Sequence, residues 1–156
     1  MADKILVFGA SQRTGLEVSK LLAGRGDQLK VFVRPTSDIA ALQALDVEFA
    51  MGNALDADSV DAAFSSGGIS AVVCTIGGSR NEPRPDVEGT KNIVASALRH
   101  NVQRLVLVTA IGAGDSRDVL TENAWKFLGP VMEMKTKAEA CLTESGLQWT
   151  ILRPGG

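Results

Sequence analysis

A glycine-rich segment near the amino end has the residue types and the spacing needed to bind phosphate groups. Residues 9–15, GASQRTG, follow an apolar run and lead into a helical pattern. A strand–turn–helix junction of this kind brings backbone amides to the amino end of a helix, where they bind anions. Gly9 and Gly15 have the spacing of the first and last glycines of a dinucleotide-binding turn, whereas Gln12 replaces the middle glycine. A simple βα turn also needs glycine, but the position after the first strand favours dinucleotide binding.

Arg34, at the expected end of the second strand, bears on which dinucleotide would be bound. At about 20 residues beyond such a turn, sites that prefer NAD place an acid against the ribose 2′-hydroxyl. This chain has Arg34 there instead, and a guanidinium suits a 2′-phosphate by its charge and its fork geometry. Arg13 in the turn could close on the same phosphate. The alternative is that both arginines are merely solvated, and we predict NADP(H) in preference to NAD(H).

Short apolar runs alternate with helical patterns along the whole chain. Strands are predicted at residues 4–8, 29–33, 47–50, 71–75, 105–109 and 149–152. Helices are predicted at residues 14–25, 38–45, 57–64, 87–101 and 130–144, the last with Pro130 as its first residue, and residues 112–129 are predicted as a loop with a short helix. Several strands are apolar throughout, as in parallel sheets that are buried on both faces. The alternation predicts one α/β domain with a doubly wound parallel sheet.

The composition excludes several classes of protein and partner. With 18 acidic and 16 basic residues among 156, the net charge is −2, so we expect neither nucleic acid nor an anionic membrane as the partner. Two distant cysteines and a single histidine do not make up a zinc site, and no metal is expected. The apolar run before Gly9 is too short for a signal peptide or a membrane span, so we expect a cytoplasmic protein.

Five segments of the chain resemble a known family. They are GASQRTG, VFVRPTSD, GNALD, DVEGTKNIVASALRHNVQRLVLVTAIGAG and KAEACLTESGLQWTILRPGG, in this order along the chain. They are similar to the atypical short-chain dehydrogenase/reductase superfamily, and within it to the NmrA-like, NAD(P)-binding group that includes biliverdin reductase B-like proteins. The resemblance implies a Rossmann fold with strand order 3-2-1-4-5-6, dinucleotide binding, and often hydride transfer to a small conjugated substrate. Members of the family continue past the RPGG end into segments that shape the substrate pocket.

The resemblance also implies which residues of this chain would bind the cofactor. They are Gly9, Ala10, Ser11, Gln12, Arg13, Thr14 and Gly15 at the diphosphate, Arg34 at the adenosine phosphate, Gly52, Asn53 and Ala54 beside the adenine, Thr75, Ile76, Gly77 and Gly78 beside the nicotinamide ribose, Thr109 and Ala110 at the nicotinamide, Lys135 at the ribose hydroxyls, and Pro154 and Gly155 at the closing turn. Lys135 and Thr109 are the catalytic candidates.

The sequence departs from the family at the catalytic tyrosine. The usual YxxxK pair lies on one helix face, but the residue four positions before Lys135 is Val131, and the chain contains no tyrosine. Ala110 stands where the partner serine is usual. Hydride transfer would then rely on positioning and on a proton from solvent or substrate, which suits flavins and quinones better than simple ketones. We therefore predict an oxidoreductase with a small conjugated acceptor. The alternative is a non-catalytic NADP(H)-binding regulator, redox sensor or assembly factor with a protein partner, and either a monomer or a homodimer is compatible with the sequence.

Overall fold

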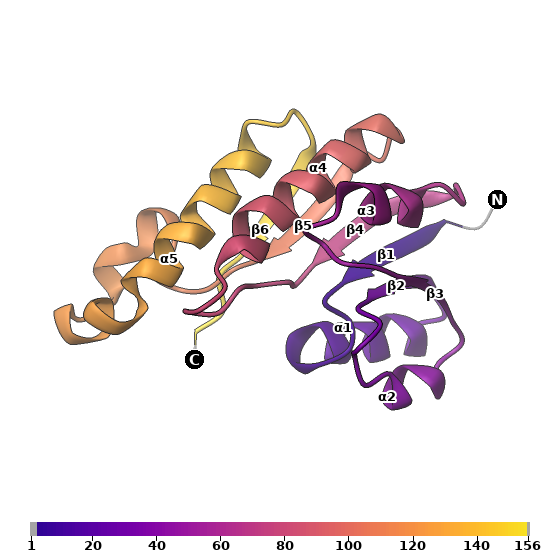
Figure 1. Ribbon diagram of the computed structural model, residues 1–156, viewed down its shortest axis with the longest axis horizontal. Helices are drawn as coiled ribbons and strands as arrows, with labels where there is room; N and C mark the ends of the chain where they lie inside the picture. The colour runs from indigo at the N-terminus through magenta and orange to yellow at the C-terminus, as the bar shows by residue number, and fades with distance from the viewer. Residues whose placement is uncertain (1–2, 156) are drawn as a thin grey trace.

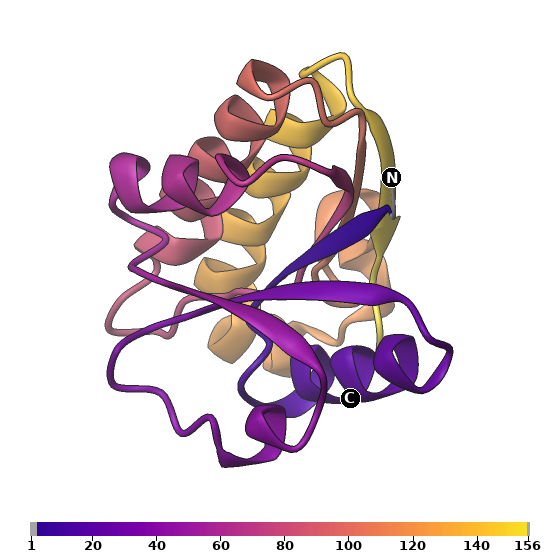
Figure 2. The ribbon, with the colours of Figure 1, turned by 90° about the vertical axis from the view of Figure 1, so that its right-hand side faces the viewer.

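The computed structural model describes residues 3–155 and contains a six-stranded parallel sheet in the order β3-β2-β1-β4-β5-β6, as predicted. The strands are β1 (Lys4–Phe8), β2 (Gln28–Val33), β3 (Val47–Met51), β4 (Ile69–Cys74), β5 (Arg104–Val108) and β6 (Gln148–Leu152). Figures 1 and 2 show the twisted sheet between two layers of helices. This is the predicted Rossmann fold.

The helices divide unequally between the two faces of the sheet. On one face lie α1 (Arg13–Gly24) and the short α2 (Ala40–Gln43); on the other lie α3 (Ala57–Phe64), α4 (Thr90–Arg99) and α5 (Glu122–Thr143) (Figure 1). Each face has its own buried cluster, with Phe8 and Leu105 on the α3–α5 side and Val7 and Val31 on the α1 side. Neighbouring residues of one strand thus enter different cores, which explains why these strands are apolar throughout.

The strand register brings three chain segments to one edge of the sheet. Phe8, the last residue of β1, pairs with Phe32 of β2 on one side and with Cys74 of β4 on the other. Because the strands are parallel, the segments that follow them leave the sheet at the same edge. The turn after β1, Arg34 after β2 and Thr75 after β4 are therefore neighbours in space.

The helix that carries Lys135 begins earlier than the sequence predicted. It starts at Glu122, after Thr121 caps it by accepting a hydrogen bond from the amide of Ala124 at 3.2 Å, so Pro130 lies inside the helix and not at its first position. Proline removes one helical hydrogen bond, but Gly129 is buried against the indole ring of Trp125. The cap at Thr121 and the packing of Gly129 on Trp125 thus allow the helix to continue past Pro130, although proline usually begins or ends a helix.

The start of the preceding helix also differs from its predicted boundary. Pro85–Gly89 forms one π-helical turn that runs directly into α4, which was predicted to begin at residue 87. The predicted loop at residues 112–129 contains a 3₁₀ helix, Gly114–Val119, and the first turns of α5. Among the described residues, no helix is both long enough and apolar enough to cross a membrane.

Candidate functional site

A cavity of about 650 Å³ opens at the edge of the sheet where β1, β2 and β4 end. Most of the predicted cofactor residues lie in its wall. Those that do are Gly9, Ser11, Gln12, Arg13, Thr14, Gly15, Arg34, Asn53, Ala54, Thr75, Ile76, Gly77, Gly78 and Lys135. The cavity therefore joins segments that are up to 126 positions apart in the chain, from Gly9 to Lys135.

The turn at the cavity floor has no room for side chains at its two glycines. A Cβ on Gly15 would lie 1.9 Å from the carbonyl oxygen of Gly9, and a Cβ on Gly9, which has a φ of +82°, would lie 2.4 Å from Oγ1 of Thr75. The Thr75 hydroxyl donates to the carbonyl oxygen of Phe8 at 3.0 Å. Thr75 thus fixes the turn against β4, and this close packing explains the glycine spacing in the sequence.

The amino end of α1 is suited to an anion. Gln12 precedes the helix in an extended conformation without a side-chain cap, and the first turn contains no acidic residue. The first amides of a helix have no partner within it, and the helix dipole favours negative charge there. A dinucleotide diphosphate fits these features, since Gly9 and Gly15 add no Cβ atoms to the turn and the cavity above it is large enough for such a ligand.

Two arginines lie at the end of the cavity expected to hold the adenosine. Arg13 and Arg34 both line it and are both exposed. Arg13 has a φ of +49°, in the left-handed region. Within residues 3–155 neither guanidinium makes an ion pair, so both remain available to a phosphate. Ser37, which the sequence analysis did not single out, lines the same part of the wall.

Lys135 reaches the other end of the cavity in an ion pair that the sequence analysis did not foresee. Its Nζ lies 2.9 Å from Oδ1 of Asp86, whose Oδ2 accepts a hydrogen bond from the amide of Gly78 at 2.8 Å. Asp86 is only 3% exposed. Its position as the first residue of the DVEGTKN motif was the available signal, but nothing in that signal connects it to a lysine 49 positions away.

The segment after β4 makes a turn and returns to the cavity wall. The amide of Ser79 donates to the carbonyl oxygen of Glu82 at 2.9 Å, and Gly78 makes room for this turn, because a Cβ there would lie 2.4 Å from the same oxygen. Glu82 and Arg84 form an ion pair and both line the cavity. Other lining residues that the sequence analysis missed are Phe32, Val33, Leu55 and Pro85.

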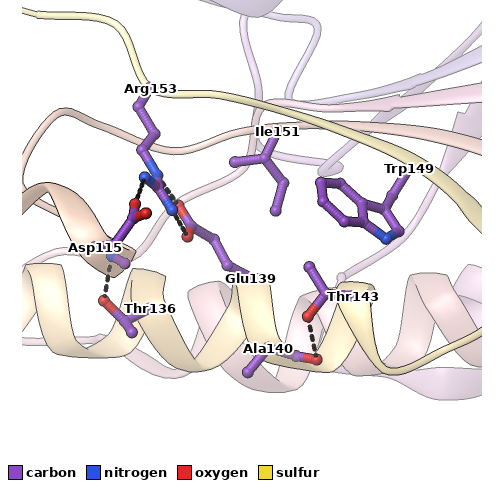
Figure 3. A pocket seen from close by; sticks show the side chains of 9 residues that line it. Asp115, Thr136, Glu139, Ala140, Thr143, Trp149, Ile151 and Arg153 are labelled. Carbon is purple, nitrogen blue, oxygen red and sulfur yellow. Dashed lines mark hydrogen bonds and ion pairs between the residues drawn. The ribbon is translucent and has the colours of Figure 1, made fainter.

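The structure places the second catalytic candidate, Thr109, outside this cavity. Its hydroxyl donates to Oε1 of Glu139 at 2.7 Å. Arg153 binds the same carboxylate through Nε at 3.0 Å and Nη2 at 2.7 Å (Figure 3). Arg153 also pairs with Asp115 and thereby holds the pKa of that carboxyl below its ordinary value. The role of Thr109 as a cofactor contact stays a prediction, and in the structure its hydroxyl is engaged with the carboxylate of Glu139.

Five further predicted cofactor residues do not line the cavity: Ala10, Gly52, Ala110, Pro154 and Gly155. Ala10 is fully buried in the core on the α1 side. Gly52 supports the wall from behind, since a Cβ there would meet the ring of Phe32 at 2.8 Å. The chain after β6 instead extends the sheet, where the amide of Ile111 donates to the carbonyl oxygen of Pro154 at 3.0 Å.

A second hollow lies between α5 and β6, away from the cofactor residues (Figure 3). It is an open groove of about 600 Å³, with Trp149 and Ile151 on the strand side and Thr136, Ala140 and Thr143 on the helix side. The Glu139–Arg153 pair closes one end of it. Among the described residues, no group of histidine, cysteine, aspartate or glutamate is arranged to hold a metal ion.

Comparison with known proteins agrees with the dinucleotide geometry. A family model described as NAD(P)H-binding matches residues 9–156, which is nearly the whole chain. The chain belongs to the NAD(P)H-binding family. The glycine-rich turn, the cavity above it and Lys135 all lie within the matched part. The resemblance to NAD(P)-binding, atypical short-chain dehydrogenases and reductases is thereby confirmed at the level of the family.

Three proteins with known names are similar to this chain over nearly its whole length. The solved structure of ChuY, described as an anaerobillin reductase from Escherichia coli O157:H7, is 30% identical, with a TM-score of 0.87 over 98% of this chain and 73% of that one. The uncharacterized sugar epimerase YhfK of Bacillus subtilis is 28% identical over 98% of this chain and 72% of its own length. The chloroplastic protein TIC 62 of Pisum sativum is 30% identical over 97% of this chain, which spans about a third (32%) of that protein.

Proposed function

We propose that this member of the NAD(P)H-binding family is an NADP(H)-dependent oxidoreductase that reduces a small conjugated acceptor. The observation that carries the NADP(H) preference is the position of Arg34, which lines the same cavity as the glycine-rich turn and has no ion-pair partner within residues 3–155. A guanidinium binds phosphate with charge and two-point geometry, whereas an acid at this position would repel it.

Each part of the cavity wall has a distinct role in binding. The turn between Gly9 and Gly15 and the amino end of α1 bind the diphosphate, while Arg34 and Arg13 neutralise the 2′-phosphate. Lys135 donates hydrogen bonds to the ribose hydroxyls at the nicotinamide end. When bound, NADPH supplies a hydride to the acceptor, and a proton from water completes the reduction and leaves NADP⁺.

The residue at the position of the family's catalytic tyrosine determines which acceptors are suitable. Val131 stands one helical turn before Lys135, where the family has its tyrosine, and offers no proton. An acceptor whose negative charge is delocalised on reduction, such as a flavin or a quinone, needs no placed acid, whereas a ketone does. The similarity to a reductase, ChuY, supports the same reaction class. The site would thus bind a small molecule and, by the charge argument, neither nucleic acid nor a membrane.

The first test is a fluorescence titration of the wild-type protein with NADPH and with NADH. We expect NADPH to bind at least about tenfold more tightly, because charged hydrogen bonds to the 2′-phosphate contribute about 1.5–3 kcal/mol. Arg34→Gln should lose about ten- to a hundredfold in NADPH affinity and change NADH affinity less than threefold. Arg104→Gln is the matched control, since Arg104 is the first residue of β5 and lies at the amino-terminal end of the parallel strands, away from the cavity. Equal affinities for the two cofactors in the wild type would overturn the NADP(H) assignment.

Turnover is the second test, and it separates this proposal from a different one. Oxidation of NADPH in the presence of a flavin and of a quinone is expected, and binding without turnover over a broad set of acceptors would overturn the enzyme assignment. The alternative is then a non-catalytic NADP(H)-binding regulator, sensor or assembly factor. The missing tyrosine favours it, as does the occurrence of a similar domain within about a third of the longer TIC 62. A protein partner retained in a pull-down would support that alternative, and a cytoplasmic location stays a prediction because TIC 62 is chloroplastic.

A further inference from the structure

We propose that Asp86 is the positioning residue of the nicotinamide end of the site, where it holds Lys135 and the backbone of Gly78 at the same time. The proposal rests on the proposed function, because it concerns how Lys135 meets NADPH. Asp86 does not need to touch the cofactor. It acts through the two groups that it binds.

The first argument is that the Asp86 carboxylate is fully engaged and nearly inaccessible. It is 3% exposed, and its two oxygens have different partners: Oδ1 binds Nζ of Lys135 at 2.9 Å, and Oδ2 accepts from the amide of Gly78 at 2.8 Å. One carboxylate therefore connects α5 to the segment after β4. A buried acid with both oxygens bound to specific donors fixes the geometry of those donors more firmly than an exposed pair does.

The second argument is the local backbone that presents Asp86. It lies in the π-helical turn Pro85–Gly89, directly before α4, and this turn packs against α5. Figure 1 shows α4 and α5 side by side on one face of the sheet. Single π-helical turns are uncommon and often occur at functional sites. Here the turn presents the carboxylate to Lys135, whose helix it contacts.

The third argument concerns the hydrogens of the lysine and the space beside it. An ammonium has three donors, and the bond to Asp86 uses one of them, which leaves two for the ribose hydroxyls. Gly77 leaves this pair uncovered: a Cβ there would lie 3.0 Å from Nζ of Lys135 and 3.5 Å from Oδ1 of Asp86. The side chain of Lys135 is only 14% exposed, so without its counterion the charge would stand unpaired in a confined space.

The test compares two ligands that share the adenosine end. NADPH contains the nicotinamide ribose, whereas adenosine 2′,5′-bisphosphate lacks it and reports only on the turn and on Arg34. Asp86→Asn keeps an oxygen for the Gly78 amide but presents to Lys135 an amide NH₂ that cannot accept. We expect this variant to bind NADPH about tenfold more weakly, with the affinity for adenosine 2′,5′-bisphosphate unchanged within twofold. Glu88→Gln, an exposed acid of the same π-helical turn, is the matched control and should bind both ligands as the wild type does.

A double variant shows whether Asp86 acts through Lys135. Lys135→Met should weaken the binding of NADPH by a similar factor. Adding Asp86→Asn to Lys135→Met should lower the affinity for NADPH by less than a further twofold. The double variant also leaves no unpaired charge, so it remains informative if Asp86→Asn alone does not fold. Steady-state kinetics with a quinone should show the weaker binding of Asp86→Asn as a higher KM for NADPH, with kcat changed less than about threefold.

The outcomes separate this proposal from the proposed function. If the wild type binds NADPH and Asp86→Asn binds it equally well, the positioning role falls while the oxidoreductase assignment stands. If Asp86→Asn weakened the binding of NADPH and of adenosine 2′,5′-bisphosphate equally, the substitution would have damaged the whole site. If it lowered the affinity for NADPH a further fivefold in the Lys135→Met background, Asp86 would act independently of Lys135. Each result overturns the proposal. A wild-type protein that binds no NADPH would overturn the proposed function, and this inference with it.

Discussion

Lys135 and Glu139 stand one turn apart on α5, and each forms an ion pair, in which the acid is buried, with a residue outside the helix. Lys135 pairs with Asp86 before α4, and Glu139 pairs with Arg153 after β6. Residues four apart share one face of a helix, so the same face of α5 is held at two successive turns. The position of Lys135 at the cavity therefore depends on the Glu139–Arg153 pair as well as on Asp86.

Arg153→Met is expected to destabilise the fold strongly. The side chain of Glu139 is only 6% exposed, and without the guanidinium its carboxylate would be left with the Thr109 hydroxyl as its remaining partner in the cluster. Removal of one partner from a buried pair costs about 3–5 kcal/mol in the free energy of unfolding. Urea denaturation followed by tryptophan fluorescence measures the change.

Two further variants separate the loss of the Glu139–Arg153 ion pair from other effects of removing the arginine side chain. Asp115→Asn removes the other partner of Arg153, but the Asp115 side chain is 94% exposed, so stability should be unchanged within the error of the measurement. In the Arg153→Met background, Glu139→Gln should recover part of the stability because no buried charge remains unpaired. A mild effect of Arg153→Met, equal to that of Asp115→Asn, would show that the buried pair does not hold α5.

Much of the fold could be predicted because its signals are local. Six apolar runs mark the six strands, and the glycine spacing at residues 9–15 marks a turn whose two glycines lie closer than side chains allow. The meeting of Arg34 with this turn then follows from parallel pairing, since segments after neighbouring strands leave the same edge. These inferences need only the periodicity of the hydrophobic residues and the topology of a parallel sheet.

The rest of the site depends on packing that no local pattern records. β5 ends at Val108, one residue before its predicted end, and the hydroxyl of Thr109 donates to Glu139, a residue 30 positions away on α5. Asp86 reaches Lys135 only because a π-helical turn precedes α4. Likewise, Pro130 is tolerated inside α5 because a cap at Thr121 and the contact of Gly129 with Trp125 support the turns before it. Each of these contacts joins residues through the folded core.

Gly15→Ala is expected to abolish cofactor binding and to destabilise the protein by about 1–3 kcal/mol or more. The added Cβ would lie 1.9 Å from the carbonyl oxygen of Gly9, and backbone cannot yield as the end of a side chain can. Chemical denaturation and an NADPH titration measure the two effects. Gly24→Ala is the matched control on the same helix, since a Cβ there meets nothing within 4 Å, and it should raise stability by up to about 1 kcal/mol. Similar behaviour of the two variants would show that the close approach of Gly9 and Gly15 is not required.

Pro130→Ala is expected to stabilise α5. Pro130 is exposed and lacks the amide that would complete the helical hydrogen bond to the carbonyl of Lys126. Alanine restores that amide and is the best helix former, so the free energy of unfolding should rise by about 1 kcal/mol or more. Thermal unfolding measures the shift, with Lys126→Ala as a control for a substitution on the same exposed turn. A decrease in stability would mean that proline at this position is needed for the packing of the helix.

Cys74 should make the stability depend on pH in the alkaline range. Burial at the end of β4 raises the pKa of its thiol from 9.0 to about 12, so the folded protein retains the proton that the unfolded chain releases above pH 9. Because the unfolded state then binds fewer protons, the free energy of unfolding falls as pH rises, by at most about 1.4 kcal/mol per pH unit between the two values. Cys74→Ala removes this contribution, while the lysines titrate alike in both proteins. The difference in unfolding free energy between the wild type and Cys74→Ala should therefore be constant below pH 8 and shrink steadily above pH 9. A constant difference up to pH 11 would contradict the shifted pKa of the buried thiol.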